Sequence, residues 1–313
     1  MKHEGRLTCV GRSLLDPCPI WSTASMHTPA LLRDAVLEFN ALLARKDIRA
    51  TGTRLSQYVT VLDEMNALEG VQLEYEQHFE LFDRYALALR EVYDLMLIQR
   101  GLSVHEPPGT DELLKIIVGG QLFAANDEDR RARNFQFQLR IASYFLRTGH
   151  VVDLSKEADV VALLSCGTLH IECKRMSSAK QVDKRVKECA RQLKGRLAAV
   201  RSMRQFGLAV FDVTKLAYPH EGVSWGPDIG FARFKFQARL SALANEFDFS
   251  GPLASVKGVL GVWLQLSMPF QDFSVGQMRV MFSSLYIPLA KSAGPTAEAF
   301  TALRRVLDAD KDL

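Results

Sequence analysis

Two short apolar runs separated by a Gly-containing turn form the most informative pattern in the chain. The first run is Val160–Leu164, the second begins at Leu169, and four residues lie between them. This pattern predicts a β-hairpin. Because successive side chains on a strand point to opposite faces, Glu172 and Lys174 share one face of the second strand. With a four-residue turn, Asp159 pairs with Lys174. We therefore expect two carboxylates and an amine to converge at the polar end of an apolar sheet.

Two interpretations of these three charges are open. An acid and a lysine two residues apart on a strand often form only an exposed ion pair, which adds little stability. However, Val160–Leu164 is continuously apolar, as expected for a strand covered on both faces. Buried charges need partners or a metal ion. The pattern thus favours a divalent cation site with a lysine beside it.

Helical patterns flank the hairpin. Residues 134–147 are predicted to form a helix that begins at Asn134 as N-cap and ends before Gly149. Gln138 lies on its apolar stripe together with Ile141 and Phe145. A glutamine in that position is expected either to bond to the backbone or to lie beside the metal.

The downstream helix, residues 180–204, is strongly basic around an apolar stripe. It holds nine lysines and arginines against two acids, in a chain whose formal net charge is +3. A solvated helix face would normally mix the two signs, so this local excess favours contact with a polyanion such as nucleic acid.

Residues 134–213 resemble the restriction-endonuclease-like, or PD-(D/E)XK, nuclease superfamily. Its pattern is a helix, a hairpin with an acid on one strand and acid-x-Lys on the next, and a second helix. Asp159, Glu172 and Lys174 match the acid, the second acid and the lysine. Ala158 replaces the proline of the motif's name, and Gln138 stands where members commonly carry a glutamate.

The resemblance implies an α/β/α sandwich with a central mixed sheet. It also implies Mg²⁺, with Mn²⁺ as a possible substitute, bound by Asp159, Glu172 and the backbone carbonyl of Cys173. Because Gln138 is neutral, we expect one metal ion held by two carboxylates. Lys174 is expected to act on the attacking water and the phosphate. Contacts with nucleic acid are expected from these side chains: Arg175, Lys180, Lys184, Lys187, Arg191 and Gln192.

The rest of the chain suggests additional parts. Residues 1–27 lack any regular period and are expected to be disordered. Residues 28–118 are predicted to form an α-helical module, and residues 119–313 the nuclease-like domain, with a boundary near 105–120 at a Pro-Pro-Gly break. The module is acid-rich and is expected to contact a protein partner or a second copy of the chain. Phe231, Phe234 and Trp263 are expected to pack in the core; the alternative role of the two phenylalanines is stacking on bases.

Composition excludes several classes of protein. No apolar run approaches the ~18 residues of a membrane span. Five cysteines without CxxC spacing disfavour a disulfide framework or a zinc site, so a reducing cytoplasm is the expected setting. The sequence thus predicts a metal-dependent nuclease acting on DNA. The alternatives are an inactive nuclease fold that binds nucleic acid and an interaction subunit of a larger complex.

Overall fold

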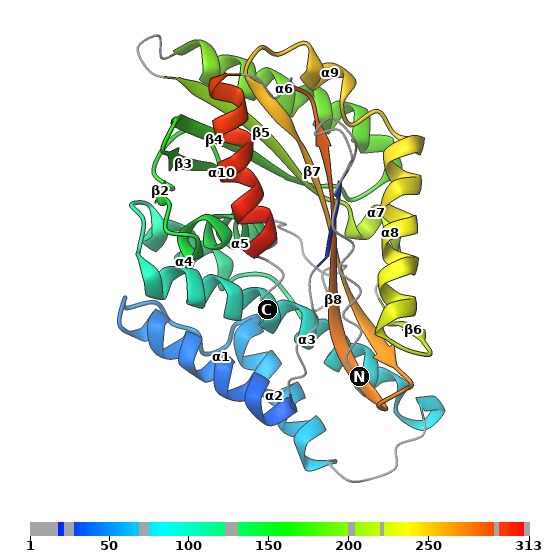
Figure 1. The fold of residues 1–313 in the computed structure, drawn as a ribbon. Helices are drawn as coiled ribbons and strands as arrows, with labels where there is room; N and C mark the ends of the chain where they lie inside the picture. The colour runs from blue at the N-terminus through cyan, green and yellow to red at the C-terminus, as the bar shows by residue number, and fades with distance from the viewer. Residues whose placement is uncertain are drawn as a thin grey trace, which may run out of the picture.

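A computed structural model describes residues 18–21, 28–68, 75–122, 131–199, 204–219, 222–290 and 294–309. The first helices are α1 (Pro29–Ala44), α2 (Arg54–Ala67), α3 (Tyr75–Val104) and α4 (Thr110–Ile117). Thr28 caps α1: its hydroxyl accepts a hydrogen bond from the Leu31 amide, and Pro29 occupies the first turn. These four helices form the helical part that the sequence predicts (Figure 1).

A curled mixed sheet follows, with the strand order β1-β8-β7-β5-β4-β3-β2 and β6 paired with β7. Its strands are β1 (Cys18–Trp21), β2 (Val151–Asp153), β3 (Val160–Leu164), β4 (Gly167–Arg175), β5 (Gln205–Asp212), β6 (Ser224–Gly226), β7 (Val259–Asp272) and β8 (Gln277–Pro288). β2, β3 and β4 are antiparallel neighbours, whereas β4, β5 and β7 run parallel. The protein is therefore a mixed α/β fold with N-terminal helices.

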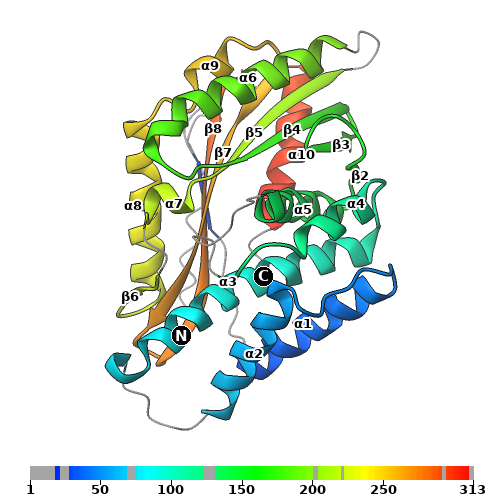
Figure 2. The same cartoon turned by 180° about the vertical axis from the view of Figure 1, so that it is seen from behind.

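Helices cover both faces of the sheet (Figures 1 and 2). One face packs on α3, α5 (Arg131–Arg147) and α10 (Pro295–Ala309). The other face packs on α6 (Val182–Ala199), α7 (Thr214–Ala217), α8 (Ile229–Glu246) and α9 (Gly251–Ala254). Alternation along β4 divides its side chains between two hydrophobic cores: Ile171 belongs to the core under α5, while Glu172 faces α6. α6 lies in the connection between β4 and the parallel strand β5, as parallel neighbours require a crossover.

The helical part and the sheet share one hydrophobic core. The core under α5 contains Leu32 and Leu62 from α1 and α2 together with Ile171 and Trp263 from the sheet. Trp263 is fully buried, which confirms the prediction for this residue. The expected boundary near 105–120 falls at α4, between two parts that contribute to this common core.

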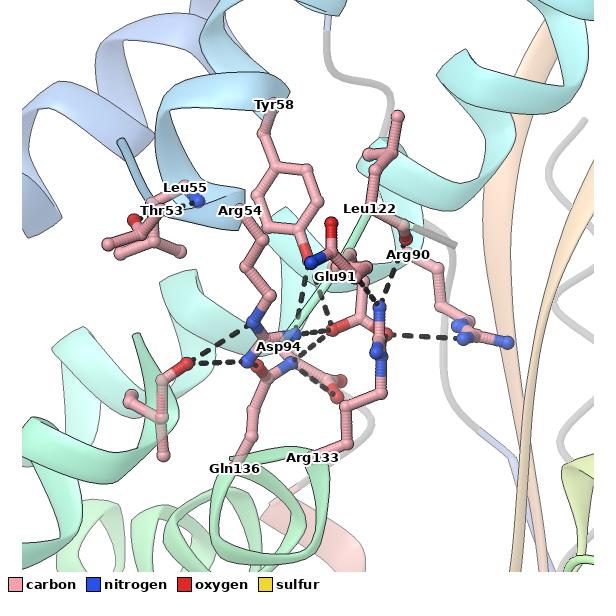
Figure 3. A network of polar contacts seen from close by, with 12 residues as sticks. Thr53, Arg54, Leu55, Tyr58, Arg90, Glu91, Asp94, Leu122, Arg133 and Gln136 are labelled. Atoms are coloured by element: carbon pink, nitrogen blue, oxygen red, sulfur yellow. Dashed lines mark hydrogen bonds and ion pairs between the residues drawn. The ribbon is translucent and has the colours of Figure 1, made fainter. Parts of the chain in front are cut away.

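A buried polar network also joins the helices (Figure 3). Glu91 of α3 accepts hydrogen bonds from Arg54 of α2 at 2.6 Å and from Gln136 of α5 at 3.0 Å. Arg133 and Arg90 lie 3.3 and 3.2 Å from the other carboxylate oxygen. Burial disfavours the ionised carboxylate, but the surrounding guanidinium groups outweigh it and hold the pKa of Glu91 well below its ordinary value. This network therefore fixes α2 and α5 against α3.

Three expectations about local structure are wrong. Residues 18–21, which fall in the segment expected to be disordered, form β1, an edge strand antiparallel to β8. The other residues of 1–27 lie outside the described ranges. Asn134 is not the N-cap of α5, because the helix already begins at Arg131. Phe231 and Phe234 are exposed rather than packed in the core, because α8 buries the opposite side of its helix, where Phe236 lies.

Candidate active site

Asp159, Glu172 and Lys174 meet where β3 begins and β4 approaches its end. Val160 pairs with Ile171, so Asp159 precedes the first residue of β3 at the level of Glu172. The turn has two residues rather than the expected four, which shifts the pairing by two positions from the prediction. A shift of two preserves the face of every side chain. The predicted convergence therefore survives an incorrect register.

Lys174 lies between the two acids. Its Nζ is 3.1 Å from Asp159 Oδ2 and 3.1 Å from Glu172 Oε2. The backbone amide of Cys173 donates a hydrogen bond to Asp159 Oδ2 at 2.7 Å. The side chain of Glu172 is 1% exposed, that of Lys174 13% and that of Asp159 27%. The site is thus a largely buried ion triad rather than an exposed ion pair.

Burial sets the ionisation of the triad. Burial, followed by the charge of the neighbouring Asp159 carboxylate, raises the pKa of Glu172 to about 7 against the opposing effect of Lys174 and Arg196. Burial alone would lower the pKa of Lys174, but the two carboxylates outweigh it, so this pKa lies above its ordinary value. Near neutral pH the lysine is therefore a stable ammonium, and Glu172 is poised between its two forms.

Helix α6 covers the triad. Burial raises the pKa of the Cys189 thiol, on which the charges of Lys174 and Glu172 also act. Gln192 and Arg196 lie on the same face of α6 as Cys189, because Gln192 follows Cys189 by three residues and Arg196 follows Gln192 by four. Arg196 Nε lies 3.7 Å from Glu172 Oε1, and its terminal nitrogens bond to Glu157. The sequence analysis counted Arg196 only as part of a basic helix, although its spacing from Cys189 on the buried stripe would have placed it beside the acids.

Two buried acceptor oxygens, one in the triad and one on α6, lack a hydrogen-bond donor among the residues that the structure describes. They are Glu172 Oε1 and Gln192 Oε1. Buried oxygens without donors are costly and call for a proton, a water or a cation. Gln192, which sequence reasoning placed among the contacts to nucleic acid, instead lies on the buried side of α6.

Gln138 occupies the other side of the sheet. It projects from α5 and donates a hydrogen bond to the backbone carbonyl of Asp159. Because Asp159 carries the carboxylate toward α6, the Gln138 amide supports the backbone and does not join the triad. Of the two roles considered for this residue, the backbone bond is the one observed.

The expected phosphate contacts divide into two groups. Lys180, Lys184, Lys187 and Arg191 are exposed at the start of α6 and in the short 3₁₀ turn before it. Lys187 pairs with Asp183 at 2.8 Å. Arg175 does not join them.

Arg175 follows Lys174 on β4 and points to the opposite face, where its Nε bonds to Asp212 at 3.0 Å. There it lines a small polar cavity under α3 and α5, together with Asp94, Arg140 and Ser267. Arg140 bonds to Asp94 at 2.8 Å. The cavity measures ≈ 10 Å³, the space of a single water molecule. Arg140 and Ser267, whose Nε and hydroxyl group lack a hydrogen-bond partner among the described residues, both line this cavity.

The donor set fits a hard cation in part. Carboxylates and carbonyl oxygens are the ligands that Mg²⁺ prefers. The Cys173 amide donates to Asp159, and the amide and carbonyl of one residue point to the same edge of a strand. The Cys173 carbonyl therefore faces the same edge, at a position beyond the last pair of β3 and β4. Within the described ranges, however, no group of three or more His, Cys, Asp or Glu side chains is placed to hold a metal ion. Any cation here would rest on two carboxylates and backbone or amide oxygens.

None of the helices in the described part of the chain is both long and apolar enough to cross a membrane. In comparisons with family models, curated proteins and solved structures, the chain matches none of them.

Proposed function

We propose that this protein is a metal-dependent nuclease of the restriction-endonuclease-like, PD-(D/E)XK type, which hydrolyses phosphodiester bonds in DNA. The order α5–β2–β3–β4–α6–β5 supports this proposal, because the resemblance implies a helix, a hairpin bearing the acids, and a second helix. The single observation that carries it is the Lys174 ammonium 3.1 Å from both Asp159 and Glu172 on one sheet face.

In this proposal Asp159, Glu172 and the Cys173 carbonyl hold Mg²⁺, for which Mn²⁺ can substitute. When bound, the ion would orient water and neutralise charge that develops on the phosphate. Glu172 Oε1, which lacks a donor, is the oxygen most in need of such a partner.

The residues of the chain would divide the remaining work. Since its pKa is raised, Lys174 is a poor base, and its role is to donate hydrogen bonds to the phosphate oxygens and to place the attacking water. The exposed basic side chains of α6 would bind flanking phosphates. Lys184 and Arg191 are suited to this role, since both are solvent-exposed on that helix.

The test is cleavage of plasmid, single-stranded DNA and RNA by purified protein, with Mg²⁺, with Mn²⁺ and with chelator. Lys174→Ala should abolish metal-dependent cleavage without unfolding the chain. Lys156→Ala is the matched control, because Lys156 also lies close to an aspartate, 3.6 Å from Asp153, but is 64% exposed and outside the triad. If Lys174→Ala cleaves at the wild-type rate, the assignment is rejected.

A second candidate is a nuclease fold that binds nucleic acid without cutting it. It is favoured by the position of Lys174, which already neutralises both carboxylates, and by the small number of metal ligands among the described residues. Salt-dependent binding with no cleavage under either metal would select it. The same helical part could serve a protein partner or a homodimer, which a pull-down and a sedimentation measurement would test.

A further inference from the structure

Four aromatic side chains gather at one end of the sheet, far from the triad. Trp225 on β6 is 63% exposed and Phe273 after β7 is 60% exposed, while Phe231 and Phe234 on α8 are 42% and 73% exposed. We call these four residues the aromatic tip. β6 and the ends of β7 and β8 lie at the lower end of Figure 1. The other large exposed hydrophobic side chains of the described chain occur in pairs on α1, on α3 and across β2 and β3, apart from Val275, which lies in the same turn as Phe273.

The rings of the tip are arranged around a lysine. The ring centroids of Trp225 and Phe273 are 6.2 Å apart and tilted by 33°. Lys235 Nζ lies 5.9 Å from the ring centroids of both Trp225 and Phe231. A hydrogen bond of 2.9 Å to Ser224 holds this ammonium in place. Cations held against aromatic rings in this way are electrostatically favourable.

Gly226 allows the rings to come together. A Cβ atom at this position would lie 2.3 Å from the ring of Phe231, so only glycine lets that ring rest on the strand. The tip is therefore built by β6, α8 and the turn after β7 acting together, and it is not a chance exposure of single residues.

Helix α8, which carries Phe231, Phe234 and Lys235, lies on the same side of the sheet as the triad, whereas Trp225 extends from the edge strand β6 toward the opposite side. α6 and α8 cover the same face, and both contribute to the core that lies under them. Lys174 of β4 pairs with Phe211 of β5, which in turn pairs with Leu264 of β7. Trp225 of β6 pairs with Gln271 of the same strand β7. These positions are seven residues apart along β7, or about 23 Å at ~3.3 Å per residue. A strand of about seven stacked nucleotides, at ~3.4 Å each, covers that distance.

We infer that the aromatic tip is a stacking platform for unpaired bases of a nucleic acid strand whose phosphates continue toward α6. This inference rests on the proposed function and adds a preference for single-stranded substrate. Exposed rings offer flat faces to any base, and Lys235 supplies charge complementary to a phosphate. Neither Lys235 nor Arg233 on α8 forms an ion pair with an acid in the described structure, so this end of α8 carries positive charge available to a polyanion.

The experiment measures binding of fluorescein-labelled (dT)15 and of a 15-base-pair duplex by anisotropy, in chelator so that nothing is cleaved. Trp225→Ala with Phe273→Ala should weaken (dT)15 binding about tenfold or more, with less than a threefold effect on the duplex. Val104→Ala is the matched control, because Val104 is 58% exposed and is the last residue of α3, whose C-terminal end lies far from the tip (Figure 1). Trp225→Phe should retain binding but lose the quenching of tryptophan fluorescence that (dT)15 causes.

Several results would overturn the inference. Equal losses for single strand and duplex would mean that the rings do not select unpaired bases. Unchanged (dT)15 affinity in the double variant would remove the platform altogether. A wild-type dimer that becomes monomeric in the variant, seen by sedimentation, would assign the tip to a second copy of the chain.

The same data separate this inference from the proposed function. A protein that binds (dT)15 through its rings yet never cleaves under Mg²⁺ or Mn²⁺ would overturn the nuclease and leave the platform. If the protein cleaves DNA but its ring variants bind (dT)15 like the wild type, the platform is overturned and the nuclease assignment stands.

Discussion

Replacing Glu172 by Gln should stabilise the metal-free protein, and the gain should depend on pH. The carboxyl group is buried, and its pKa in the folded chain is about 7, against an ordinary value of 4.5. Between these values the folded chain keeps a proton that the unfolded chain has released. The free energy of unfolding therefore falls as pH rises from about 4.5 and levels off above about 7. Gln mimics the protonated form and should escape this loss.

The magnitude follows from the shift. A difference of about 2.5 pKa units at ~1.36 kcal/mol per unit corresponds to about 3 kcal/mol at pH 8. The side chain is 1% exposed, so solvent screening reduces this figure little. At pH 5 the advantage of Glu172→Gln should shrink to about 0.8 kcal/mol. Comparing variant with wild type at each pH removes the contribution of every other titrating group.

The assay is urea denaturation in chelator at pH 5, 6, 7 and 8, with the slope on denaturant required to be equal for both proteins. Glu157→Gln supplies the baseline for the chemical change itself, because this nearby carboxylate is 84% exposed. A Glu172→Gln protein that is no more stable than wild type at pH 8 would refute the reasoning. So would an advantage of the same size at pH 5.

Further predictions concern the metal, the core network and the basic helix. Mg²⁺ at about 100 times its dissociation constant should stabilise the wild type at pH 8 by about 2.7 kcal/mol in thermal unfolding; a shift of the same size in Asp159→Asn would count against the proposed ligands. Glu91→Ala leaves three buried guanidinium groups without their common carboxylate, and should lower the free energy of unfolding by about 3–5 kcal/mol in urea; a loss below 1 kcal/mol would mean that other groups hold the network together. Lys184→Ala should reduce the slope of log affinity for DNA against log salt by about one, and an unaltered slope would exclude a phosphate contact there.

The sequence by itself determined what depends on local periodicity. The alternation of side chains along β4 placed Glu172 and Lys174 on one face, and this result does not change when the register moves by two. The same alternation sends Arg175 to the other face, a consequence the sequence analysis did not draw. The start of α6, a helix with a continuous apolar stripe, was also located to within two residues, at 180 against the observed Val182.

Tertiary packing decided the burial, the ionisation and the contact partners of the site residues. The pKa of Glu172 comes from the helix that covers it, and Arg196 reaches the triad only because α6 lies across β4. Gln138 remains on the far side of the sheet because α5 packs there. Phe231 and Phe234 share the apolar character of buried residues but face water, since α8 has only one face to bury. Periodicity specifies the direction of a side chain relative to its own element. The solvent exposure, ionisation state and contact partners of that side chain are set by elements distant in the sequence.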